Sequence, residues 1–70
     1  MKYVGTKQVL KAVQCGKTKK VYIGKDVERH VVEELLKTCK QNKIEIVYIE
    51  TMKELGKLAG IEINAATAAE

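Results

Sequence analysis

The chain has 70 residues, of which 46% are hydrophobic and 31% are charged. This composition excludes a disordered chain and predicts a single domain, residues 1–70. The longest unbroken apolar run, Ile46–Ile49, is far shorter than the ~20 residues that cross a bilayer, and the sequence does not open with a leader pattern. We therefore expect a cytoplasmic protein without a membrane partner, and a monomer by default.

The charged residues are unevenly distributed along the chain. Residues 1–25 hold seven lysines and no acidic residue, whereas residues 26–70 hold six basic and nine acidic residues, which together give the net charge of +4. A block of one sign in a third of a globular chain suggests an anionic partner such as nucleic acid. A solvated, lysine-rich surface would explain the same pattern.

The first elements expected are an edge strand and an amphipathic helix. The short apolar stretch Lys2–Val4 leads into Gly5, and Thr6 is the expected N-cap. Apolar side chains then recur at helical spacing, with lysines on the opposite face. Gly16 is expected to end this helix, because glycine tolerates a positive φ.

Two further elements carry clear apolar patterns. Val21–Gly24 predicts a buried strand, and Asp26 is the expected cap of a second helix that Asn42 closes. Ile44–Ile49 predicts another strand. The inner face of the second helix is expected to be one apolar arc, formed by Val27, Val31, Val32, Leu35, Leu36 and Cys39.

The last part of the chain predicts a short helix, a loop and a strand. Thr51 and Glu54 have the spacing of a capping box, and Gly60 is expected to stop the helix. Residues 61–63 then form a loop and residues 64–70 a short last strand. The residues of this helix expected to point inward are Leu55, Leu58 and Ala59.

Strands that alternate with helices imply parallel pairing through right-handed crossovers. The expected fold is therefore of the α/β class, a three-layer α/β/α sandwich with a mixed sheet of about four strands.

Residues suited to catalysis are sparse. His30, the only histidine, falls on the polar face of its helix, Cys39 belongs to the apolar arc, and Cys15 lies near a helix end without a neighbouring base. The chain has no serine, no glycine-rich phosphate loop and no spacing of metal ligands. We therefore expect no enzyme, no catalytic residue, no cofactor and no metal.

The segment Gly5–Lys11 carries the clearest signal of binding. Free amide groups and the positive end of the helix dipole gather at a helix start, where they suit phosphate. Lys7 and Lys11 lie four residues apart on one face, and the Gln8 amide can donate to and accept from a base edge. An ordinary amphipathic surface helix would show the same spacing.

A second candidate segment is Ile61-Glu62-Ile63, just after a helix-ending glycine. Exposed isoleucines there could pack against splayed bases, as RNA recognition often requires. Alternatively, the segment begins the last strand, with Ile61 and Ile63 pointing inward at period two.

The pattern "GTKQVLKAV … KTKKVYIGKDVE … IEIVYIETMKELGKLAGIEINAA" resembles the kink-turn RNA-binding family of ribosomal proteins, which includes the archaeal seven-Ae and eukaryotic thirty-e proteins and small bacterial homologues. The resemblance runs from Val4 to Ala66. Its most specific parts are the turn Gly5–Lys11 and the segment Lys53–Ile63. Archaeal and eukaryotic members carry Gly-Ala-Asn-Glu where this chain has Gly5-Thr6-Lys7-Gln8, and bacterial homologues resemble the version found here.

This resemblance implies an α/β/α sandwich that grips a sharply kinked RNA helix. In the family the glycine turn approaches sheared G·A pairs, and the loop matching Ile61–Ile63 covers the opened groove. Glu28 matches a position that contacts an extruded base, and Val32 matches its apolar support. The residues expected to bind RNA are Gly5, Thr6, Lys7, Gln8, Lys11, Lys20, Glu28, Val32, Ile61, Glu62 and Ile63.

Our hypothesis is a non-enzymatic protein that recognises and stabilises kink-turns in structured RNA, ribosomal or ribosome-associated, with the ribosome as a candidate partner. The alternative is a protein–protein interaction module that docks an acidic partner on its basic face.

Overall fold

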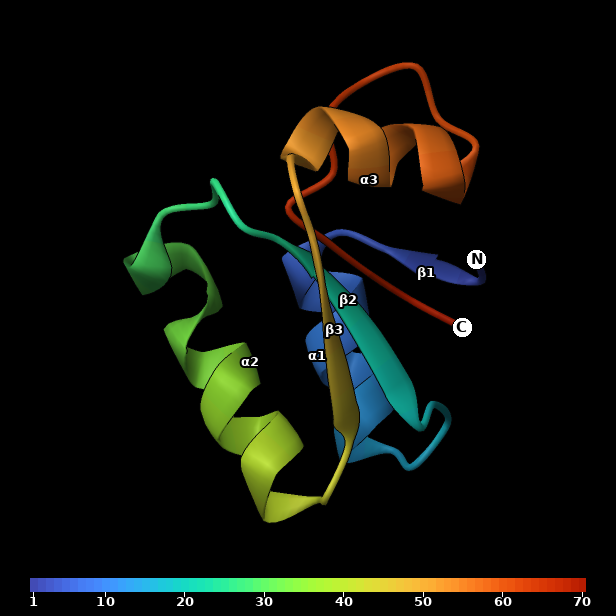
Figure 1. Ribbon diagram of the computed structural model, residues 1–70. Coiled ribbons are helices and arrows are strands. Elements are labelled where there is room, and N and C mark those ends of the chain that lie inside the picture. Colours follow the sequence, from blue (N-terminus) through green and yellow to red (C-terminus); the bar gives the residue numbers. More distant parts are fainter.

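The computed structural model describes all 70 residues as a four-stranded sheet between two layers of helices (Figure 1). The expected α/β/α sandwich with a mixed sheet is confirmed. The elements in chain order are β1 (Tyr3–Val4), α1 (Thr6–Gln14), β2 (Lys20–Gly24), α2 (Arg29–Gln41), β3 (Glu45–Ile49), α3 (Met52–Ala59) and β4 (Thr67–Ala69). No helix is both long and apolar enough to cross a membrane.

The strand order is β1-β4-β2-β3, and only part of the sheet is parallel. β2 and β3 pair in parallel, with Val21 opposite Ile46, through the crossover helix α2. β4 lies antiparallel to both β1 and β2. The parallel expectation therefore holds for the β2–β3 pair alone, because the chain turns back along α3 before it enters β4 (Figure 1).

The core has one part on each face of the sheet. On the face covered by α1 and α2, the buried side chains include Val9, Val13, Ile23 and Leu35. On the face covered by α3, Leu55 packs with small residues of the last segment of the chain. Since successive strand residues point to opposite faces, β2 supplies Val21 and Ile23 to the first part and Tyr22 to the second.

The prediction that Asp26 caps α2 is wrong. The helix begins at Arg29 with Glu28 as its N-cap, which makes no side-chain hydrogen bond. Asp26 instead accepts a hydrogen bond from the backbone N–H of Met52, at 2.8 Å, and so caps the first turn of α3. The β2–α2 turn is thereby tied to the start of another helix, a contact that spacing along the chain cannot reveal.

Two apolar side chains expected inside lie outside. Val31 of α2 is 42% exposed and Leu58 of α3 is 58% exposed, because each falls at the border of its helix's inner face. Val32, Leu35 and Cys39 of the predicted arc are buried and Leu36 packs against the core, whereas Val27 lies in the turn before α2, half-buried against the same core.

The boundaries of α3 follow its sequence signals. The Thr51 side chain accepts the backbone N–H of Glu54 at 3.0 Å, as the capping box predicts, and Gly60 takes a left-handed conformation with φ 78° at the C-cap.

Replacing Thr51 tests this cap. Thr51→Ala leaves the amide of Glu54 without its acceptor and is expected to lower the free energy of unfolding by about 1 kcal/mol in urea denaturation. Thr51→Ser keeps the hydroxyl and is the matched control. Equal stability of the two variants would show that the cap contributes nothing.

Candidate nucleic-acid interface

Helix α1 begins at a position whose backbone conformation suits only glycine. Gly5, not Thr6, is the N-cap, with φ 98° and ψ 145°, close to a region that side-chain-bearing residues rarely adopt. It has no side chain to cap the helix, and its carbonyl accepts the first helical bond, from Val9 at 3.0 Å. The amides of Thr6, Lys7 and Gln8 precede that bond, so they are free to meet an external acceptor.

The side chains around these amides are cationic or amide-bearing and exposed. Lys7, Gln8 and Lys11 are all exposed, and the first turn holds no acidic residue. Free N–H groups, the helix dipole and the lysine charges therefore favour a negative group at the same place.

Thr6 has a structural role in addition to its backbone. Its hydroxyl accepts a hydrogen bond from the buried Thr67 hydroxyl at 3.4 Å, and the amide of Gly5 donates to the Thr67 carbonyl at 2.9 Å. The first turn of α1 is thus fixed to the start of β4.

Several other elements begin or end next to the first turn of α1, at the edge of the sheet where β2 ends and β4 begins. The amide of Gly24, at the end of β2, donates to Ala66 at 3.0 Å, just before β4. The amide of Ala65 donates to the carbonyl of Met52, whose own amide is held by Asp26. The start of α1, the β2–α2 turn, the start of α3 and the segment before β4 therefore form one hydrogen-bonded edge.

The Ile61–Ile63 loop runs back along α3 from the end of that helix (Figure 1). The amide of Ile61 donates to the carbonyl of Gly56 at 3.0 Å, and the Ile63 carbonyl lies so close to Gly56 that a Cβ there would be 2.1 Å from it. Ile61 is half-buried in the cluster around Leu55, whereas Glu62 is exposed and Ile63 is 74% exposed.

Neither sequence interpretation of this loop holds in full. β4 begins only at Thr67, so the loop does not start the strand, and one isoleucine points inward while the other points to solvent.

Glu28 and Val32 differ in accessibility. Glu28 is exposed at the start of α2 and lies 3.3 Å from the His30 ring. Val32 is only 3% exposed and belongs to the core, which leaves little surface for an extruded base.

Lys20 is separated from the other predicted residues. It begins β2, while Gly24, which lies at the assembled edge, ends it, about 13 Å away at the rise of a strand. Its ammonium lies 5.6 Å from the centre of the Tyr22 ring, and its pKa is raised, first by Tyr22 and then by Glu45.

The structure brings some of the predicted residues to this edge. Gly5–Gln8 lie there on the α1 face of the sheet, and Glu28 follows through the β2–α2 turn. The 61–63 loop packs on Gly56 of α3 on the other face and is joined to the edge through Ala65 and Ala66, while Lys20 lies at the far end of β2. No cavity of the molecule is lined by both Gln8 and Ile61. The candidate interface is an open surface.

His30 and Cys39 lie in different surroundings. His30 Nδ1 lies 3.3 Å from the Glu28 carboxylate, with both side chains exposed. Burial raises the pKa of the Cys39 thiol, which disfavours the reactive thiolate. No group of three or more potential ligands could hold a metal ion.

The fold and this edge define a small α/β/α domain that presents an uncapped, basic helix start beside a loop. The chain belongs to the ribosomal protein L7Ae/L30e/S12e/Gadd45 family, whose model matches residues 3–70. This confirms the resemblance to the seven-Ae and thirty-e proteins.

Three proteins illustrate the relationship. The chain is 55% identical over 67 residues to an RNA-binding protein of Caldanaerobacter subterraneus subsp. tengcongensis, covering 96% of this chain and 82% of that one. It is 42% identical over 66 residues to an RNA-binding protein of Halalkalibacterium halodurans, covering 94% and 80%. The solved Giardia lamblia 15.5kD RNA binding protein matches with a TM-score of 0.87 and 25% identity, over 94% of this chain and 56% of that chain.

Proposed function

We propose that this protein binds structured RNA and stabilises its kink-turns, without catalysing a reaction. The observation that carries the proposal is the uncapped first turn of α1, where free amides and the exposed Lys7, Gln8 and Lys11 meet no acidic side chain. The names of the relatives, which are RNA-binding proteins, support RNA as the anion. A ribosomal or ribosome-associated role, a cytoplasmic location and a monomeric state belong to the same proposal.

The proposed mechanism is a shift of population between two RNA conformers. A kinked RNA brings phosphates together, and lysines at the α1 start favour that conformer because they interact with it more strongly than with the straight one. The first-turn amides and Gln8 read base edges in the groove that the kink opens, and Ile63 covers exposed bases from the other side of the edge.

A substitution at Gln8 distinguishes the recognition of bases from the attraction between charges. Gln8→Ala removes an uncharged side chain, so it should cost about 1–3 kcal/mol on a kink-turn duplex and little on a straight duplex of the same length. Fluorescence anisotropy titrations of both duplexes at one salt concentration measure the difference. Lys20→Gln is the control, since Lys20 lies at the far end of β2 and should leave both affinities nearly unchanged.

The outcomes distinguish the two candidate functions. An equal effect of Gln8→Ala on both duplexes would remove Gln8 from base recognition. Equal affinity of the unmodified protein for both duplexes would exclude kink-turn recognition and favour an interaction module for an acidic protein.

A further inference from the structure

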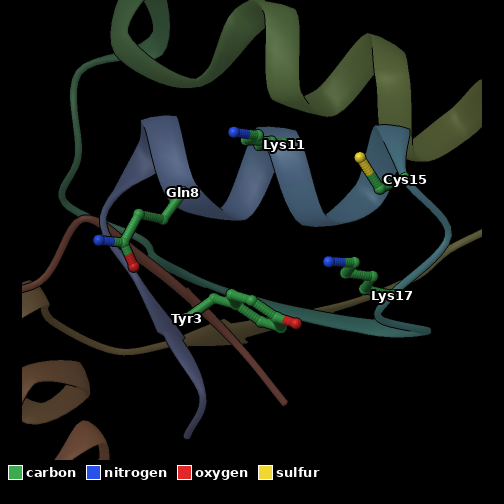
Figure 2. A pocket seen from close by; sticks show the side chains of 5 residues that line it. All are labelled: Tyr3, Gln8, Lys11, Cys15 and Lys17. Carbon is green, nitrogen blue, oxygen red and sulfur yellow. The ribbon is translucent and has the colours of Figure 1, made fainter.

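A groove runs along α1 on the side of the edge strand β1, away from the Ile61–Ile63 loop. It has a volume of about 200 Å³ and is lined by Tyr3, Gln8, Lys11, Cys15 and Lys17 (Figure 2). This volume is below the roughly 300–1,000 Å³ of pockets that enclose a small molecule. The groove therefore suits part of an extended chain better than a whole ligand.

The charge of the groove is uncompensated. The ion pairs of the molecule join Lys25 to Glu50 and His30 to Glu28, so neither Lys11 nor Lys17 is paired. No acidic residue lines the groove. Two unpaired ammonium groups on opposite sides of one groove favour a polyanion there.

Tyr3 provides a fixed aromatic surface in the same groove as these cations. The residue is half-buried, packs against the core beneath α1 and α2, and is held in the sheet by the β1–β4 pairing. Figure 2 shows its ring beneath α1, between Gln8 and Lys17. Grooves that bind single-stranded nucleic acid combine these features, since cations follow the backbone while bases stack on an aromatic ring.

The groove is continuous with the proposed kink-turn surface, because Gln8 belongs to both. We propose that it binds a single-stranded RNA segment flanking the kinked element, with phosphates beside Lys11 and Lys17 and a base stacked on Tyr3. This inference rests on the proposed function and extends it, since it names a second part of the RNA and a second set of contacts.

The first test compares two kink-turn RNAs, one blunt and one with a single-stranded extension of about six nucleotides, within the roughly 4–16 that such grooves cover. The extension is placed in turn on each strand end. At one of these ends it should raise the affinity of the unmodified protein about tenfold. Tyr3→Leu and Lys17→Gln should remove most of that gain and leave binding of the blunt RNA nearly unchanged.

Lys37→Gln is the matched control for charge. Lys37 is exposed on α2 beside Glu33 and Glu34, outside the groove, so its loss should preserve the gain. A gain that all variants retain, or no gain from any extension, would overturn the inference. Equal affinity of the unmodified protein for kinked and straight blunt duplexes would instead overturn the proposed function.

The second test needs no substitution, because the groove contains the exposed Cys15 while Cys39 is fully buried. Iodoacetamide should alkylate Cys15 severalfold more slowly when the protein is saturated with the extended RNA than with the blunt RNA. Blunt RNA controls for added negative charge. Equal rates with the two RNAs would show that the extension does not occupy the groove, even if it binds elsewhere.

Discussion

Gly56→Ala is expected to lower the free energy of unfolding by about 2 kcal/mol or more, although alanine is the better helix former. A Cβ at this position in the middle of α3 would lie 2.1 Å from the carbonyl oxygen of Ile63 and 3.2 Å from its carbon. Both atoms belong to the backbone, so no side chain can rotate to make room. The loop that follows α3 must move away from the helix.

The consequence reaches the candidate interface. The displaced segment contains Ile61–Ile63 and leads to Ala65, whose amide holds the start of α3. We therefore expect the variant to lose affinity for a kink-turn duplex as well as stability in urea denaturation. Lys57→Ala, at the exposed next position, is the control and should change stability by no more than about 0.5 kcal/mol. A Gly56→Ala variant as stable as Lys57→Ala would mean that the loop does not pack on α3.

Gly5→Ala is expected to cost about 1–3 kcal/mol of stability and to weaken kink-turn binding strongly. Nothing lies within 4 Å of an added Cβ, so the cost comes from the backbone conformation at φ 98° and ψ 145° and not from a clash. Relief of this strain would rotate the first turn of α1, and the amides of Thr6 to Gln8 would no longer point to the same place.

Gly16→Ala is the matched control at the other end of α1. A Cβ added at Gly16 would also meet nothing within 4 Å. The φ of Gly16 is 68°, in the left-handed region that alanine enters at a cost of about 1–2 kcal/mol. Thermal unfolding and anisotropy titration of both variants separate the effects, since Gly16→Ala should bind the blunt kink-turn duplex as the unmodified protein does. Equal loss of binding in the two variants would indicate general destabilisation.

Local patterns along the chain predicted the elements well. The α2 arc, the Thr51 cap and the left-handed Gly60 follow from spacing and from residue types whose effect is local. The same rules failed where a contact joins distant segments. Asp26 has the right position to cap α2, but its carboxylate finds the amide of Met52, and helical spacing does not fix how wide an inner face is, as exposed Leu58 shows.

The last strand shows the clearest limit of hydropathy. Ala68 and Ala69 carry little apolar surface, and hydropathy alone predicts no more than a short last strand for this segment. β4 instead lies inside the sheet between β1 and β2, with both alanines fully buried. Small side chains suit a strand that is covered by helices on both faces. Only the tertiary packing shows that β4 is covered in this way.

The candidate interface was predictable in part. The α1 start could be recognised from Gly5, Lys7, Gln8 and Lys11, because a helix N-terminus has known free donors. The position of Lys20 depends on the direction of β2, and the groove at Tyr3 and Lys17 depends on how β1 packs beside α1. Neither is encoded in residue spacing.

The central claim is that the protein stabilises the kinked conformer of its RNA. Fluorescence resonance energy transfer between dyes on the two ends of a kink-turn duplex, without added divalent cations, measures that conformer directly. We expect transfer to rise to a saturating level as protein is added, and not to rise for a duplex whose G·A pairs are replaced by Watson–Crick pairs. Binding without a rise in transfer on the kink-turn duplex would contradict the central claim.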